Sequence, residues 1–187
     1  FDKVKNYEFI KNTSLHDYKI INKHIKNISK FWIQAQKNIV FNNEINPIYN
    51  IFKTHSSNVI LNEYQFTTPK LTQGCIYIVR DPRDIAVSFA GHRGKSINDT
   101  IDFMSKIESY FLPKNDHVLT LLTSWDTHYK SWMQLNVPIL LIKYENLLEN
   151  PKIEIKKIIK FLNKLLKIDT KNSNNKLNNI CISTNLK

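Results

Sequence analysis

The sequence predicts an α/β fold with a largely parallel sheet, because short apolar runs alternate with segments of helical periodicity along the chain. Residues 75–80 follow Gly74 and are rich in β-branched residues, and residues 137–144 are almost continuously apolar, as strands buried on both faces are. Residues 48–55 form a shorter β-rich run, which we also expect to be a buried strand. The length suits one core, so we expect a single domain over residues 1–187.

Helical periodicity marks most of the remaining chain. Apolar residues recur at three- and four-residue steps over residues 14–39, which predicts one amphipathic helix or two. Three further helices are expected over residues 98–110, 118–133 and 154–166, the last behind Pro151. Strands separated by helices in this way indicate a parallel sheet, because the chain must cross back over the sheet between parallel neighbours.

The composition is that of a folded protein with a basic surface. Apolar residues make up 42% of the chain, and the formal net charge is +11. A basic nucleic-acid binder is one interpretation, and a steep loss of DNA or RNA affinity with salt would reveal it. Lysines are scattered along the whole chain and arginine is rare, however, so we interpret the charge as a solvated surface and expect no nucleic-acid partner.

Cysteine and histidine usage predicts no metal site. Cys75 and Cys181 have no second thiol nearby, so we expect both to be free, packed thiols in a reducing compartment. His92, His117 and His128 lack metal-ligand spacing. No signal-peptide pattern opens the chain, and no apolar run approaches the roughly 18 residues of a membrane span. We therefore expect a cytoplasmic protein with no membrane partner.

The strand predicted over residues 75–80 ends in a candidate anion site. Asp81 can cap a helix and Pro82 suits the first helical position, so a helix should begin here. A helix N-terminus offers unpaired N–H groups to an anion, while Arg80 adds a bidentate fork and Ser88 a hydroxyl donor. By spacing alone, surface ion pairs explain the charges of this segment equally well (Arg80, Asp81, Arg83 and Asp84).

Residues 75–92, CIYIVRDPRDIAVSFAGH, closely resemble the 3′-phosphate-binding segment of sulfotransferases that use 3′-phosphoadenosine 5′-phosphosulfate (PAPS). In that family the Arg at the strand end and the Ser eight residues later bind the 3′-phosphate, so the resemblance implies Arg80 and Ser88 as cofactor-binding residues. Residues 124–132 resemble the family's Ser-Trp…His…Ser-Trp helix. The resemblance also implies a three-layer α/β/α fold of the P-loop nucleotide-kinase type.

Two further segments resemble the family in the same order. Residues 51–55, IFKTH, are similar to a Lys-Thr-His strand end, which implies that His55 takes the acceptor's proton and Lys53 stabilises the transferring group. Residues 139–151 are similar to a strand followed by Tyr-Glu-Asp-Leu, which implies that Tyr144 lies against adenine.

The two catalytic assignments agree with elementary chemistry. An alcohol is a poor nucleophile at neutral pH, and imidazole exchanges protons in that range. A lysine supplies a counter-charge for oxygens on which charge builds during transfer. Two residues apart on one strand, Lys53 and His55 would face the same side. Without the resemblance, a lone His after Thr is more often a structural hydrogen-bonding group.

Two elements of the family are not found in the sequence. Its phosphosulfate loop contains Pro-Lys-Ser-Gly, which no Pro-Lys pair here continues (Pro69, Pro113 and Pro151). Gly94-Lys95-Ser96 lacks the first glycine of a P-loop, which argues against a small-molecule kinase. No Arg-Lys-Gly element follows Gly94 either. We therefore expect a partial domain, cut at both ends, with unpaired strand edges, uncovered apolar faces and little or no activity of its own.

The sequence thus predicts a PAPS-dependent sulfotransferase that transfers a sulfuryl group to a hydroxyl or amine and needs no metal. The acceptor could be a small molecule, a carbohydrate or a lipid, and the residues specify neither this choice nor an oligomeric state. The alternative is a non-catalytic remnant that binds adenosine 3′,5′-bisphosphate or another anion and transfers nothing.

Overall fold

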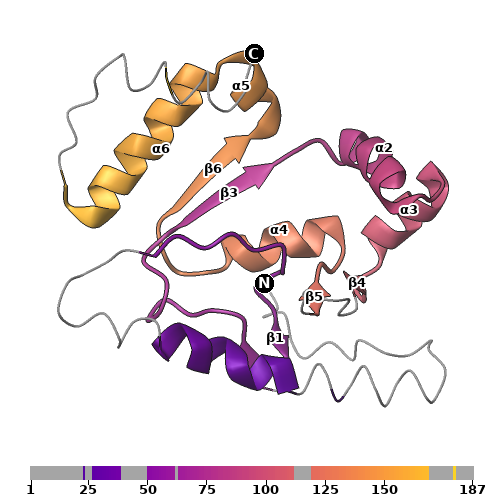
Figure 1. Cartoon of the computed structure of the whole chain (residues 1–187), viewed down its shortest axis with the longest axis horizontal. Helices are drawn as coiled ribbons and strands as arrows, with labels where there is room; N and C mark the ends of the chain where they lie inside the picture. The colour runs from indigo at the N-terminus through magenta and orange to yellow at the C-terminus, as the bar shows by residue number, and fades with distance from the viewer. Residues whose placement is uncertain are drawn as a thin grey trace. The chain divides into compact units, whose positions relative to one another are not determined.

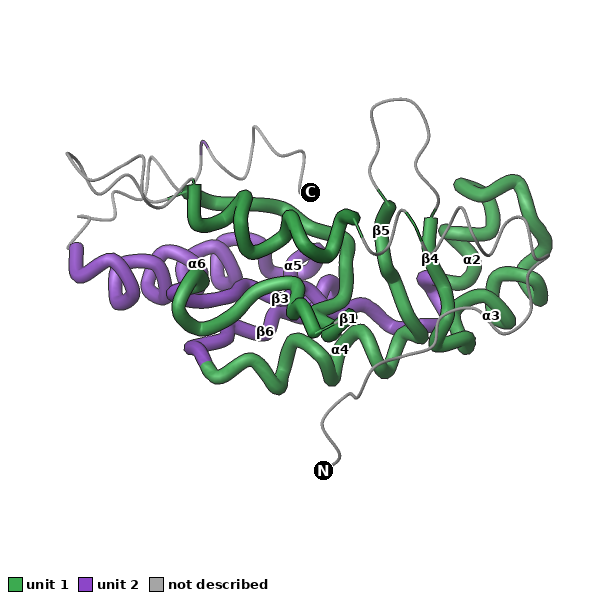
Figure 2. Tube along the Cα trace, turned by 90° about the horizontal axis from the view of Figure 1, so that it is seen from below, with its two compact units in different colours: residues 1–72, 86–136 green, residues 73–85, 137–187 purple. Residues whose placement is uncertain are grey.

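The computed structural model describes residues 23, 27–38, 50–61, 63–111, 119–168 and 179. The chain divides into two compact units, drawn in different colours in Figure 2. The first contains residues 1–72 and 86–136, and the second contains residues 73–85 and 137–187. The predictions for Cys181, for His117 and for residues 48 and 49 lie outside the described residues.

The second unit is built on a parallel strand pair. β3 (Cys75–Val79) and β6 (Ile139–Lys143) lie side by side and point the same way, with Cys75 opposite Ile139 (Figure 1). β6 leads directly into the short helix α5 (Tyr144–Glu149), and α6 (Pro151–Leu166) follows. The two strands and the final helix predicted from the sequence are therefore confirmed.

The sheet is less buried than the apolar runs predicted. Ile142 is 1% exposed, but Ile78 is 52% and Leu141 is 42% exposed. Within the described residues β3 and β6 pair only with each other, so this parallel sheet has two strands and no complete three-layer architecture is seen. The prediction of strands buried on both faces is wrong here, because so narrow a sheet leaves alternate side chains uncovered.

Gly74 lies just before β3, at a point where α6 comes close to the chain. A Cβ atom at this position would lie 2.5 Å from Cδ1 of Leu165 and 3.2 Å from the carbonyl oxygen of Pro138. That carbonyl is held in place, because it accepts a hydrogen bond of 3.0 Å from the N–H of Cys75. We expect Gly74→Ala to lower the free energy of unfolding by about 1–2 kcal/mol, measured by urea denaturation.

Gly91→Ala is the matched control for this change. Gly91 lies inside α2 (Pro82–Arg93), and a Cβ there would meet no atom within 4 Å. Glycine weakens a helix interior by about 0.5–1 kcal/mol relative to alanine, so this substitution should raise stability. Equal stability of the two variants would contradict the close approach of α6 to Gly74.

The core of the first unit includes short strands that the sequence did not predict. β1 (Ile60–Leu61) and β2 (Tyr64–Gln65) form an antiparallel pair, as do β4 (Tyr110–Phe111) and β5 (Thr120–Leu121). Four residues on or beside these strands form one buried hydrophobic cluster (Val59, Leu61, Leu119 and Leu121). Strands of two residues cannot be predicted from a sequence, because the alternation of apolar and polar residues becomes recognisable only over about four residues or more.

Residues 27–38 form a helix, which agrees with the apolar periodicity of that segment. The ring of Trp32 meets the ring of Phe66 edge-on at a centroid distance of 5.2 Å. The side chain of Gln36 donates a hydrogen bond of 2.8 Å to the carbonyl of Phe66. None of the helices in the described part of the chain is long and apolar enough to cross a membrane.

The segment Gly94-Lys95-Ser96 joins two helices, whereas a P-loop follows a strand. Gly94 has a φ of 61°, and the N–H groups of Gly94 and Lys95 donate back to the carbonyls of the last turn of α2. This is the Schellman arrangement, in which glycine adopts the left-handed conformation most easily. Ser96 then caps α3 (Ile97–Ser105) by accepting a hydrogen bond of 3.1 Å from the N–H of Asp99.

Two of the predicted helices are shorter than expected. α3 ends at Ser105 rather than near residue 110. α4 (Trp125–Met133) covers only the second half of the helix predicted over residues 118–133. Thr123 has a φ of 60°, outside the right-handed helical region, so the chain turns there before Ser124 caps α4.

Candidate functional site

The turn between β3 and α2 has the local structure that the sequence predicted. Arg80 directly follows the last residue of β3, and α2 begins at Pro82. The carboxylate of Asp81 accepts a hydrogen bond of 2.9 Å from the backbone N–H of Arg83, which is the bond of a helix N-cap. Capping explains why the helix begins here, and it confirms the role expected of Asp81.

Arg80 lies against an aromatic ring from α5, the helix that directly follows the other strand of the sheet. Its guanidinium carbon stands 4.8 Å from the centre of the ring of Tyr144, the first residue of α5. A guanidinium over an aromatic face is stabilised by the negative charge density of the ring. The Nε of Arg80 is buried and has no hydrogen-bond partner among the described residues. The structure therefore brings together two predicted cofactor-binding residues, Arg80 and Tyr144.

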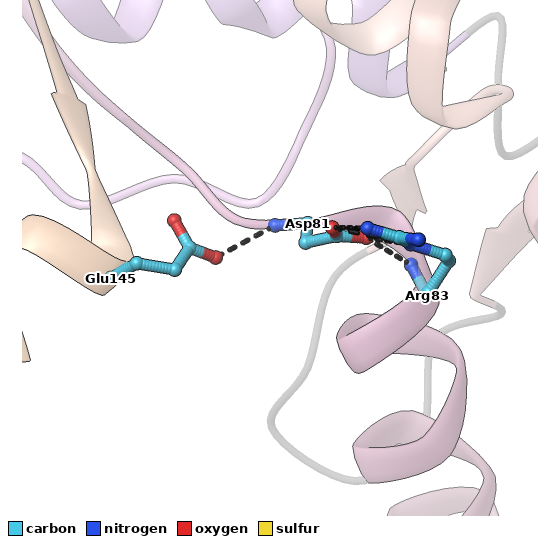
Figure 3. A network of polar contacts seen from close by, with 3 residues as sticks. All are labelled: Asp81, Arg83 and Glu145. Atoms are coloured by element: carbon cyan, nitrogen blue, oxygen red, sulfur yellow. Dashed lines mark hydrogen bonds and ion pairs between the residues drawn. The ribbon is translucent and has the colours of Figure 1, made fainter.

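Glu145 binds the backbone of the same turn, a contact that the sequence analysis missed. One of its carboxylate oxygens accepts a hydrogen bond of 2.9 Å from the N–H of Asp81 (Figure 3). This bond is the largest cause that holds the pKa of Glu145 below its ordinary value. The only sequence signal was its place directly after Tyr144, in the segment that resembles the family's Tyr-Glu pair.

Asp81 and Arg83 form a surface ion pair. Nη2 of Arg83 lies 2.6 Å from Oδ2 of Asp81, and the side chain of Arg83 is 88% exposed. The side-chain hydrogen bond from Arg83, more than any other cause, lowers the pKa of Asp81 to about 2. The ion-pair interpretation of this segment is therefore correct for this pair. Arg80 takes part in no ion pair among the described residues.

Acid should weaken this turn. The pKa of Asp81 is about 2 in the folded chain and 3.8 ordinarily, so its carboxylate contributes stability that is fully present above about pH 4. The contribution is lost as the pH falls through the folded-state value. The measurement is thermal unfolding of wild type and Asp81→Asn from about pH 5 to pH 2. We expect wild type to be the more stable at the higher pH, and we expect the difference in melting temperature to disappear at the lower pH.

Asp102→Asn makes the same chemical change at an exposed position of α3. This carboxylate is in no ion pair among the described residues, so the variant is the matched control for the loss of a surface charge. A gap between wild type and Asp81→Asn that stayed constant down to about pH 2 would contradict a stabilising role for this ion pair.

The segment that carries Lys53 and His55 is not the buried strand predicted over residues 48–55. Residues 50–55 form no strand and are exposed, with Ile51 at 82% and Phe52 at 66%. No neighbouring strand pairs with this segment in the described residues, so its apolar side chains have no sheet to pack in. The expectation that Lys53 and His55 face the same side depended on a strand and loses that basis.

Side chains of α4 form hydrogen bonds to the backbone carbonyls of His55 and Ser56, which follow Lys53 closely in the chain. Nε2 of His128 lies 3.2 Å from the carbonyl oxygen of His55, and because a carbonyl only accepts, the imidazole must donate. Nε1 of Trp132 donates to the carbonyl of Ser56 at 3.1 Å. Burial lowers the pKa of His128 and so favours the neutral ring. This histidine makes a structural hydrogen bond to the backbone of His55.

The predicted site residues are divided between the two units. Lys53, His55 and Ser88 belong to the first unit, and Arg80 and Tyr144 belong to the second. Ser88 is an exposed residue of α2. Among the described residues no hydrogen bond or ion pair joins the side chains of Lys53, His55 and Ser88. No group of three or more metal-ligand side chains occurs in the described residues either.

A parallel strand that ends in an arginine and runs into a capped helix is an arrangement with which α/β proteins bind phosphate groups. This chain belongs to the sulfotransferase domain family, which matches residues 3–187. The family predicted from residues 75–92 is therefore confirmed.

Individual relatives are distant and longer. Sulfotransferase 1B1 of Canis lupus familiaris is 32% identical over 132 residues, which are 66% of this chain and 40% of that protein. Sulfotransferase 1A1 of Mus musculus is 34% identical over 99 residues, 51% of this chain and 32% of that protein. A 3-alpha-hydroxysteroid sulfotransferase of Cavia porcellus is 28% identical over 95 residues, 49% of this chain and 32% of that protein. The chain spans two fifths or less of the length of these relatives.

Proposed function

We propose that this chain is part of a cytoplasmic PAPS-dependent sulfotransferase and that it binds the 3′-phosphate of the nucleotide through Arg80 and Ser88. The observation that carries the proposal is the state of Arg80, whose Nε is buried without a partner at the end of β3. A buried donor without a partner costs free energy, and an anion at the start of α2 would satisfy it. The residues present therefore fit a phosphate group.

The remaining assignments follow the family resemblance. When bound, PAPS supplies the sulfuryl group that an acceptor hydroxyl or amine receives. His55 would hold the acceptor's proton, Lys53 would stabilise negative charge, and Tyr144 would contact adenine while also supporting Arg80. We propose one partial domain over residues 1–187, belonging to a three-layer P-loop nucleotide-kinase-like fold. Metal is not part of this scheme. The acceptor belongs to the broad class of small molecules, carbohydrates and lipids.

The test of the 3′-phosphate site is a binding measurement that needs no turnover. Adenosine 3′,5′-bisphosphate and adenosine 5′-monophosphate differ only in the 3′-phosphate, so isothermal titration with both isolates its contribution. We expect the bisphosphate to bind at least about 100-fold more tightly, since a bidentate Arg80 would make two charge-assisted hydrogen bonds that contribute about 1.5–3 kcal/mol each. Ser88→Ala should narrow that preference by roughly 10-fold, because its hydroxyl would donate to an ionised phosphate oxygen, a charge-assisted bond of about 1.5 kcal/mol or more. Equal affinity of wild type for the two nucleotides would refute the site.

The second candidate is a nucleotide-binding remnant without transfer activity. The observation that favours it is the segment of Lys53 and His55, which is exposed and forms no strand. Incubation with PAPS and a phenol separates the two candidates when this chain is compared with a form to which the family's phosphosulfate loop has been added. Sulfated phenol produced by the extended form at a rate that falls in His55→Ala supports the enzyme, whereas selective binding of the bisphosphate without any product from either form supports the remnant.

A further inference from the structure

The first two residues of α5 contact two successive residues of the β3–α2 turn. The guanidinium carbon of Arg80 lies over the ring of Tyr144, 4.8 Å from its centre. The carboxylate of Glu145 accepts a hydrogen bond of 2.9 Å from the N–H of Asp81. All four residues belong to the second unit. The two segments are 64 residues apart in the chain, and the parallel pairing of β3 with β6 brings them together.

The hydrogen bond of Glu145 goes to backbone and not to a neighbouring cation. The guanidinium of Arg83 is paired with the carboxylate of Asp81 (Figure 3). Among the ion pairs of the described residues, neither Arg80 nor Arg83 is bound to Glu145. A carboxylate that accepts an amide N–H makes a charge-assisted bond, which is shorter and stronger than a neutral one. The bond fixes the peptide between Arg80 and Asp81 without a hydrogen bond from the side chain of Arg80, whose positive charge also helps to lower the pKa of Glu145.

The peptide that Glu145 holds is the one that orients Arg80. Its N–H belongs to Asp81, the cap of α2, and its carbonyl belongs to Arg80. Rotation of this peptide would change both the direction of the Arg80 side chain and the start of the helix. Recognition by a bidentate fork depends on direction as well as charge, so a small rotation is costly to binding.

We propose that Glu145 is a positioning residue for recognition of the 3′-phosphate: its carboxylate fixes the peptide after Arg80 and thereby aims the guanidinium at the anion. This inference rests on the proposed role of Arg80. Glu145 does not contact the phosphate itself in this scheme, because two like charges would repel. It acts through Arg80, which contacts the 3′-phosphate, so its effect should appear only with ligands that carry this group.

Three variants test this role, with the ratio of the affinities for adenosine 3′,5′-bisphosphate and adenosine 5′-monophosphate as the readout. Glu145→Ala should reduce the ratio by roughly 3- to 10-fold, the range expected when the net contribution of one hydrogen bond is lost. Glu145→Gln keeps an acceptor oxygen and should restore most of the ratio. Glu149→Ala, which removes an exposed carboxylate from the same helix, should leave it unchanged. A general loss of folding would instead weaken both nucleotides alike.

Amide hydrogen exchange gives a second readout that does not depend on the nucleotide. The amide of Asp81 should exchange faster in Glu145→Ala than in wild type and in Glu149→Ala. If the exchange rate is unchanged, or if Glu145→Ala keeps the wild-type affinity ratio, the positioning role is overturned. If wild type itself shows no preference for the bisphosphate while Asp81 remains protected by Glu145, the 3′-phosphate site is what fails, and the inference falls with it.

Discussion

Arg80→Ala should lose about 100-fold or more of the preference for adenosine 3′,5′-bisphosphate over adenosine 5′-monophosphate, since a bidentate contact removes two charge-assisted hydrogen bonds at about 1.5–3 kcal/mol each. The affinity for the monophosphate should change little. Isothermal titration of both nucleotides against wild type and variant measures the ratio. This is the largest expected effect on binding, because no other described side chain of this turn combines a positive charge with a buried donor that lacks a partner.

Two further substitutions sharpen that result. Arg80→Lys keeps the charge but loses the fork and the planar contact with Tyr144, so it should retain only part of the preference. Arg83→Ala removes the same charge three positions along, from a side chain that is 88% exposed and paired with Asp81, and should have a small effect. Equal losses in Arg80→Ala and Arg83→Ala would mean that overall charge, and not a built site, attracts the nucleotide.

Trp132→Ala should produce the largest loss of stability, about 3–5 kcal/mol, which is the usual range for a buried tryptophan. Trp132 is 6% exposed, its ring meets Phe66 edge-on at 6.0 Å, and its N–H donates to the carbonyl of Ser56. The substitution would leave a cavity and an unpaired carbonyl together. Urea denaturation followed by circular dichroism measures the change.

Trp132→Phe separates the two contributions. It keeps most of the ring and loses the hydrogen bond, so we expect a cost of about 1–2 kcal/mol. Amide exchange at Ser57 and Asn58 should accelerate in both variants, because α4 holds this part of the chain through Trp132 and Ser131. A loss of stability below about 1 kcal/mol in Trp132→Ala would show that the ring is not part of a packed core.

The start of α2 could be predicted from the sequence because it depends on neighbours in the chain. Asp81 caps this helix through a bond to a residue two positions away, and Ser96 caps α3 through a bond to a residue three positions away. Where a local conformation interrupts an apolar pattern, as at Thr123, periodicity alone predicted too long a helix.

The family and the parallel pairing of two strands could also be predicted, since the family's motifs and long apolar runs are properties of the sequence. The state of the segment with Lys53 and His55 could not. A β-rich run becomes a buried strand only if another strand pairs with it, and in the described residues none does. Its exposure was therefore decided by tertiary context.

The sequence by itself determined which family the chain belongs to, where α2 begins and which residue, Arg80, follows the first strand of the parallel pair. Only the tertiary structure showed that Tyr144 lies under Arg80, that Glu145 holds the N–H of Asp81 and that His128 holds the carbonyl of His55. The reason is the separation along the chain, 64 residues for Glu145 and 73 for His128. Hydrogen bonds between residues so far apart in the sequence form only when the packing of strands and helices brings the partners together, so no local sequence pattern predicts them.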